Sequence, residues 1–162
     1  MNKSSTDGDG HTPLALASRD GKVDVVRVLL EAGADVNKST TGGDGHTPLT
    51  FASVYGEVEV ARVLLEAGAD MNKRNSEGRS PLYLSLKVVF WHPEQRNQGK
   101  AKVAALLHEA GAQEPTAFEL QQMEQEIAQE IAQFNEMVVE MIAGGQMEQE
   151  IAQPNSDFEG MI

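Results

Sequence analysis

Apolar and polar positions follow the same order twice in the first half of the chain. The segments "DGHTPLALASRDGKVDVVRVLLEAGADVNKST" and "DGHTPLTFASVYGEVEVARVLLEAGADMNKRN" begin at Asp9 and Asp44. A weaker third copy begins at Glu77 and is interrupted by "FWHPEQRNQG". In each copy, apolar residues at helical spacing predict a short helix and then a second, amphipathic helix. Neither helix could bury its apolar face alone, whereas stacked copies could.

Turn and cap residues separate these helices. In the first copy, Gly10 suits a turn with positive φ, Thr12 suits a helix N-cap, and Pro13 suits the first helical position. Gly21 is expected to break the first helix, and Gly33 is expected to lie just past the end of the second. The second copy repeats these residues 35 positions later, because "TTGG" lengthens the junction. Leu64-Leu65 and Leu106-Leu107 are 42 residues apart, nine more than the 33 from His46 to Arg79, which predicts a nine-residue insertion in the third copy.

These residues closely resemble the ankyrin repeat. The family pattern of a turn, "G-x-TPLHLA", a glycine and "VVxxLLxxGADVN" is matched nearly letter for letter at 10–37 and 45–72. The third copy departs from it, most clearly at Ser80, at Ser85 and in the insertion. The resemblance covers residues 2–113 and implies an all-α solenoid of helix-turn-helix repeats. The expected segments are 1–8 as the end of a preceding repeat or a junction, repeats at 9–43 and 44–76, and a modified third repeat at 77–115.

The start of the chain aligns with the segment that begins at Val36. We therefore expect the chain to be cut from, or descended from, a longer array, the alternative being a natural start with a shared junction sequence. In a cut array the first repeat would expose an apolar flank.

The resemblance implies that a partner protein docks on the concave face, which the turn tips and the first helix of each repeat form. Tyr55, Tyr83 and the arginines are the expected anchors, because aromatic residues and Arg dominate interface energetics. The alternative is that each of these residues is merely solvated. The positions that correspond to this face are Asp9, His11, Arg19, Asp20, Asp44, His46, Val54, Tyr55, Glu77, Arg79, Tyr83 and Lys87.

The aromatic pair in the insertion and the turn asparagines are two further features of the sequence. Trp91, next to Phe90 in the insertion, is expected to pack back onto the third repeat or the tail, the alternative being a binding knob. Asn37 and Asn72 fall at the turn asparagine of the family, which the resemblance implies organises the turn; some family members are hydroxylated there.

Residues 116–162 predict an acidic amphipathic helical extension. Thr116 and Glu119 form the pattern of a capping box, and a helix of about seven turns is expected to end at Gly144-Gly145. Its apolar stripe spans an arc of about 100°. Three interpretations stay open: a cap over the end of the array, a dimer interface, or a segment that docks into a partner's groove. The stripe comprises Leu120, Met123, Ile127, Ile131, Phe134, Val138, Met141 and Ile142.

Charge changes the expectation for partners. Residues 1–108 hold all 13 Lys and Arg and 13 of the 25 Asp and Glu, so the net charge of −12 comes from residues 109–162. We therefore expect no nucleic acid and no membrane as partners. Because uniform Glu without Lys disfavours a coiled coil, a monomer is expected rather than a homodimer through the tail helix.

The chemistry of the side chains predicts no catalysis. The chain has no Cys, which excludes disulfides and thiolate sites and favours an intracellular, cytoplasmic or nuclear location. Four scattered His and no supported nucleophile indicate no metal site, no cofactor and no enzyme. The sequence thus predicts a non-catalytic adaptor, scaffold or inhibitor that binds through the concave face. The alternative is a regulator whose acidic amphipathic helix is the partner-binding or self-association element.

Overall fold

The computed structural model describes residues 10–87 and 94–143. Phe90 and Trp91, the first residues of the insertion, and Asp9 lie outside this range, so the predictions made for them are not addressed by the structure. The chain divides into two compact units between Gln121 and Gln122, and each unit is described by itself. Every regular element in the described residues is an α-helix.

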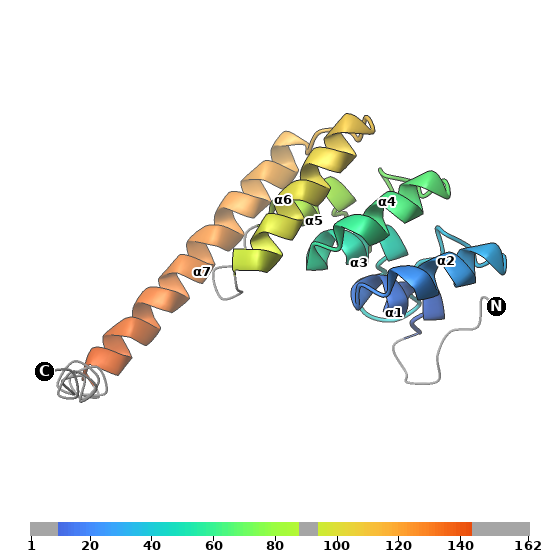
Figure 1. Ribbon diagram of the computed structural model, residues 1–162. Helices are drawn as coiled ribbons and strands as arrows, with labels where there is room; N and C mark the ends of the chain where they lie inside the picture. Colours follow the sequence, from blue (N-terminus) through green and yellow to red (C-terminus); the bar gives the residue numbers. More distant parts are fainter. Residues whose placement is uncertain (1–9, 88–93, 144–162) are drawn as a thin grey trace, which may run out of the picture. The chain divides into compact units, whose positions relative to one another are not determined.

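Six helices of the first unit form three consecutive pairs (Figure 1). The pairs are α1 (Pro13–Arg19) with α2 (Val23–Glu31), α3 (Pro48–Tyr55) with α4 (Val58–Glu66), and α5 (Pro81–Leu86) with α6 (Glu94–Glu109). The first helices α1, α3 and α5 contact one another in order, and so do the second helices α2, α4 and α6. The result is a two-layer stack, as expected of a solenoid.

The first helix of each pair begins at a hydroxyl cap followed by proline. The Oγ1 of Thr12 accepts from the backbone N–H of Ala15 at 3.1 Å, and the Oγ1 of Thr47 accepts from that of Thr50 at 3.2 Å. Proline at the first helical position costs the helix no hydrogen bond, because an N–H at this position would have no intrahelical partner. The predicted caps are therefore confirmed, and Gly10 has the expected positive φ of 62°.

The second helices end in the same glycine motif. In α2, the N–H of Gly33 donates to the carbonyl of Leu30 at 2.9 Å, and the N–H of Ala34 donates to that of Leu29 at 3.0 Å. This pair of bonds is a Schellman motif, and Gly33 supplies the left-handed conformation that it needs, with φ of 82°. The motif recurs at Gly68 and Gly111, which confirms the predicted helix ends.

The core is aliphatic and repeats from pair to pair. Leu14, Leu49 and Leu82 occupy the second position of α1, α3 and α5, and all three are buried. In the second layer, Leu64 and Leu107 are also fully buried. Equivalent positions thus stack along the array, and burial of each such side chain stabilises the fold by roughly 1.5–3 kcal/mol.

The first helix pair has an exposed apolar flank. Val25 and Val28 of α2 are exposed, whereas Val60 and Val63, their counterparts in α4, are buried. For Val28 and Val63 the exposed fractions are 63% and 5%. Among the helices that the structure describes, α4 packs against both α2 and α6, whereas α2 packs mainly against α4 within its layer, which accounts for the difference.

Part of the insertion in the third repeat is helical and lengthens the second helix of that repeat. Helix α6 has 16 residues, whereas α2 and α4 have nine each. The prediction of a nine-residue insertion is wrong, because the insertion is one residue longer. The carbonyls of Leu64 and Leu107 accept the equivalent hydrogen bond of the terminal glycine motif, so the counterpart of Leu64 is Leu107 and not Leu106. Gly99 within α6 faces Gly56. A Cβ added to Gly99 would lie 2.3 Å from the carbonyl oxygen of Gly56.

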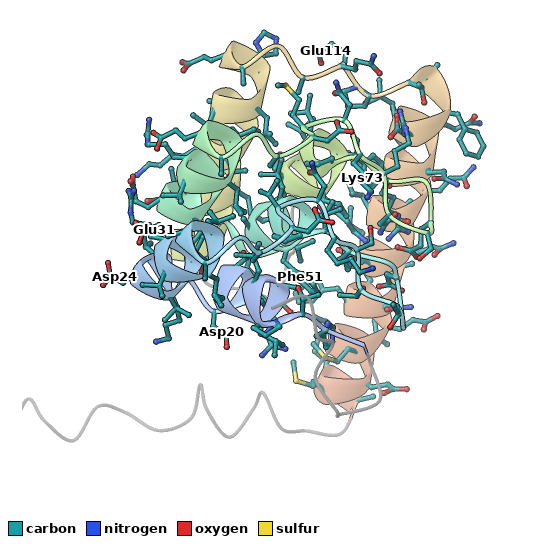
Figure 2. The ribbon with its side chains drawn as sticks, turned by 90° about the vertical axis from the view of Figure 1, so that its right-hand side faces the viewer. Asp20, Asp24, Glu31, Phe51, Lys73 and Glu114 are labelled. Carbon is teal, nitrogen blue, oxygen red and sulfur yellow. The ribbon has the colours of Figure 1, made fainter. Side chains whose placement is uncertain are left out.

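Two asparagines link successive turns of the stack. The side-chain oxygen of Asn37 accepts from the backbone N–H of Asp70 at 2.8 Å. In the next repeat, the side-chain oxygen of Asn72 accepts from the N–H of Gln113 at 2.8 Å. The Nζ of Lys73, labelled in Figure 2, also donates to the carbonyl of Asn37 at 2.7 Å. These bonds give the turn asparagines the organising role that the resemblance implied.

Helix α7 (Ala117–Ala143) begins with the predicted capping box. The N–H of Glu119 donates to Thr116 Oγ1 at 3.2 Å, and the N–H of Thr116 donates to Glu119 Oε2 at 2.7 Å. The carboxylate of Glu119 also pairs with Arg74, from the turn before α5. Burial raises the pKa of Glu119, but the hydrogen bonds from Arg74 and Thr116 outweigh it and hold the pKa below its ordinary value.

Candidate functional site

A groove of about 410 Å³ lies in the first unit, between the turn that precedes α3 and the helix itself. Five of the residues predicted to bind a partner line it: His11, Asp44, His46, Val54 and Tyr55. The remaining lining residues are Thr40, Gly42, Gly43 and Phe51. The structure therefore gathers residues from two successive turns and one first helix around one hollow of the size that small-ligand pockets have, about 300–1,000 Å³.

The first junction is two residues longer than the second, and its extra residues, Gly42 and Gly43, line the groove. Thr40 has a counterpart in Asn75 of the second junction, because their N–H groups donate to the equivalent carbonyls of His46 and Arg79. The N–H of Thr40 donates to the carbonyl of His46 at 2.9 Å, and the Oγ1 of Thr40 donates to the carbonyl of Gly42 at 3.3 Å. The positive φ of Gly43, 61°, lets the chain turn sharply at this point.

Aromatic rings form one wall of the groove. Phe51, which Figure 2 labels on α3, contacts the imidazoles of both His11 and His46. The centroid of the Phe51 ring lies 5.6 Å from that of His11, in an edge-to-face arrangement. It lies 5.0 Å from that of His46, and these two rings are tilted. These distances fall in the favourable range for aromatic pairs. Phe51 itself is buried, with 7% of its surface exposed.

His46 is a half-buried side chain of the groove with polar neighbours on both ring nitrogens. Its Nδ1 lies 3.2 Å from Thr50 Oγ1, and its Nε2 lies 3.6 Å from Asp44 Oδ2. Burial is the main cause that lowers the pKa of His46 below its ordinary value. The carboxylates of Asp44 and Glu77 act in the opposite direction without reversing it, whereas the charges of Arg79 and His11 add to the lowering. His46 is therefore neutral near pH 7.

The neighbouring turn carries an ordered charge pair. Arg79 Nη1 donates to Glu77 Oε2 at 2.8 Å, and Asn75 Oδ1 accepts from the N–H of Glu77 at 3.1 Å and from that of Arg79 at 2.9 Å. The guanidinium of Arg79 also lies over the ring of Tyr83, 5.8 Å from its centroid. Glu77 and Arg79 thus offset each other's charge beside the groove.

Other predicted contact residues lie elsewhere or differ from expectation. Tyr83 was expected to be an exposed anchor, which is wrong: it is 0% exposed, because its ring belongs to the buried side of α5. Arg19 and Asp20, at the end of α1, pair with each other at 2.8 Å. The hydrogen bond from Arg19 lowers the pKa of Asp20. Lys87 is half-buried at the end of α5, and its carbonyl accepts from Lys100 Nζ.

Sequence reasoning missed part of the groove. Phe51 occupies the position of Leu16 in the first repeat, and no role was predicted for it. No binding role was predicted for the two glycines of the longer junction. A signal for both was present, because the lengthened turn directly precedes the repeat whose first helix carries the aromatic residue.

The apolar stripe predicted for α7 is partly exposed. Leu120, Ile131, Phe134 and Ile142 are exposed. The other stripe residues, Met123, Ile127, Val138 and Met141, are half-buried.

Within 10–87 and 94–143, no group of three or more His, Asp or Glu is placed to hold a metal ion. In the same part of the chain, no helix is both long enough and apolar enough to cross a membrane.

Comparison with known proteins agrees with the fold. Residues 1–75 match the family described as ankyrin repeats (3 copies). No curated protein matches the chain. The family match covers the two regular helix pairs and every residue that lines the groove.

Proposed function

Because residues 1–75 of this chain belong to the ankyrin-repeat family, we propose that the protein is a non-catalytic module that binds another protein through its concave face. Ankyrin repeats are generally protein-interaction modules and are typically not enzymes. The role as adaptor, scaffold or inhibitor, the action as a monomer, and the location inside the cell belong to this proposal. The observation that carries it is the groove of about 410 Å³ beside α3, which five of the predicted contact residues line.

The groove has the features of a protein-binding site. Tyr55 and Val54 offer half-buried apolar surface, and Asp44 offers an exposed charge at the edge. Rigid aromatic residues at the centre of a contact and polar residues around it are typical of interfaces. Phe51 and the two histidines are held by one another, so little ordering is needed on binding.

Selection of peptides tests this proposal. A random peptide library displayed on phage is selected on the full chain, and the best peptides are titrated against Val54→Lys and Val28→Lys. Val54 lines the groove, whereas Val28 is an exposed valine on α2. We expect the groove variant to bind at least about tenfold more weakly and the control to bind as the wild type does. Equal binding by both variants, or no selected peptide at all, would refute binding through the groove.

A second candidate rests on α7. Its exposed apolar residues and its glutamates suit a partner-binding or self-association helix, which would make the repeats a support for this helix. Two truncations separate the candidates. The chain that ends at Gln121 keeps Glu119 with Arg74 and Thr116, whereas the chain that ends at Pro115 loses these contacts.

We expect the form ending at Gln121 to bind the selected peptides as the full chain does, and to have the mass of a monomer. The form ending at Pro115 is expected to melt a few degrees lower, because Arg74 loses its partner. Loss of peptide binding in the form ending at Gln121 would transfer the binding function to α7. A dimeric full chain that becomes monomeric on this truncation would assign α7 to self-association.

A further inference from the structure

Two hydrogen-bond acceptors, one on His46 and one on Asp44, lie close together at the edge of the groove. Thr50 Oγ1 donates its hydrogen to the carbonyl of Thr47 at 2.8 Å, so it is an acceptor toward His46 Nδ1. The hydrogen-bond network therefore assigns the proton of neutral His46 to Nδ1 and leaves Nε2 as an acceptor. Nε2 lies 3.6 Å from Asp44 Oδ2, which is also an acceptor.

No protein donor within residues 10–87 and 94–143 satisfies this pair of acceptors. Their separation of 3.6 Å is longer than a hydrogen bond, and two acceptors cannot bond each other directly. A group with N–H donors placed between them would satisfy both at once. The carboxylate of Asp44 would also favour a positive charge on that group.

The rest of the groove suits a planar cation. The rings of Phe51 and Tyr55 line the space beside the two acceptors, and cations are attracted to aromatic faces. Arg79, whose positive charge acts on His46, is paired with Glu77 at 2.8 Å. Its charge is therefore largely offset and does not exclude a second cation.

From this geometry we propose that the groove binds an arginine side chain of the partner protein, with guanidinium N–H groups donating to Asp44 Oδ2 and His46 Nε2. The inference rests on the proposed function and adds the chemistry of the partner. Arginine is favoured over lysine because its guanidinium is planar, presents donors in a fixed fork, and stacks on aromatic rings. A lysine ammonium is more strongly hydrated and makes a less directional contact.

Amide chemical shifts of the full chain, isotopically labelled, test the inference. The probes are Nα-acetyl-arginine amide and Nα-acetyl-citrulline amide, which have nearly the same shape but differ in charge. We expect the arginine probe to shift the amides of Asp44, His46 and Tyr55 and to bind at least about tenfold more tightly than citrulline. Asp44→Asn should abolish this preference, whereas Asp24→Asn, the same change on α2 (Figure 2), should leave it intact.

Protonation of His46 provides a second readout. Binding of the arginine probe should weaken between about pH 7.5 and about pH 5, because a protonated Nε2 can no longer accept. The charged groups that face His46 are Asp44, Glu77, Arg79 and His11, and none of them removes this effect. Nitrogen chemical shifts of the imidazole should show the proton on Nδ1 at neutral pH.

Several outcomes would overturn the inference. Equal binding of citrulline, no groove shifts with the arginine probe, or a neutral His46 protonated on Nε2 would each do so. The peptide selection described above shows whether only the arginine inference fails or whether the proposed function fails as well. If selected peptides lack arginine but still lose affinity with Val54→Lys, the groove binds a protein by other chemistry, and only the arginine inference fails.

Discussion

His46 links the groove to the pH dependence of stability. Its pKa is lowered in the folded protein, mainly by burial, so the unfolded chain takes up a proton at higher pH than the folded chain does. Stability therefore rises with pH wherever the unfolded state binds more protons. The contribution of His46 is fully present above the unfolded pKa and declines as pH falls through it toward the folded pKa.

We predict that the free energy of unfolding falls between about pH 8 and about pH 5.5, and that His46→Gln reduces this fall. Urea unfolding of both proteins at several pH values measures the difference. Other groups titrate in both proteins, so only the difference between them is assigned to His46. A difference that grows as the pH is raised would contradict the lowered pKa.

A matched pair of valines measures how well the first helix pair is covered. Val28 and Val63 are counterparts in α2 and α4, with exposed fractions of 63% and 5%. We predict that Val28→Lys changes stability by less than about 0.5 kcal/mol, whereas Val63→Lys costs about 3 kcal/mol or more, since it buries a charge. Denaturant unfolding measures both. A comparable loss for Val28→Lys would show that this flank is covered in solution.

At the scale of the elements, α6 depends on a close approach to α3. An added Cβ at Gly99 would lie 2.3 Å from the carbonyl oxygen of Gly56. Alanine normally stabilises a helix interior by about 1 kcal/mol relative to glycine. At this position the steric overlap is expected to outweigh that gain, because overpacking typically costs about 1–3 kcal/mol.

We therefore predict that Gly99→Ala lowers the melting temperature, even though it raises helix propensity. Ala105→Gly, at an exposed position of the same helix, serves as the control and should also destabilise, by about 1 kcal/mol. Thermal unfolding followed by circular dichroism measures both changes. If alanine proved better than glycine at both positions, helices α3 and α6 would not approach so closely.

The helices themselves could be predicted from local chemistry. The hydroxyl caps, the prolines that follow them and the terminal glycines act over a few residues, so the sequence indicates where helices begin and end. Burial depends on residues far apart in the chain, which explains the wrong expectation for Tyr83. Predicting the groove would require combining two sequence features, the longer junction and Phe51. Neither feature alone shows that they lie side by side in the folded protein.

At the scale of the whole molecule, bonds between repeats hold the stack together. Asn37 and Asn72 each bond the backbone of the following turn, at Asp70 and Gln113. We predict that Asn37→Ala and Asn72→Ala each cost about 1–2 kcal/mol. Urea unfolding of the single and double variants measures the costs, which should add within about 0.5 kcal/mol if the two links act separately. Losses below about 0.3 kcal/mol for both would show that packing alone sets the stack.

The two asparagine bonds span different lengths of chain: the first joins residues 33 apart and the second joins residues 41 apart. Both nevertheless connect the same positions of adjacent turns, because Asp70 and Gln113 each follow a terminal glycine by two residues. Register in this array is therefore set by matching turns and does not require repeats of equal length. For protein engineering, repeats of different lengths can consequently be joined in one array, provided that the asparagine of each turn meets the backbone two residues after the next terminal glycine.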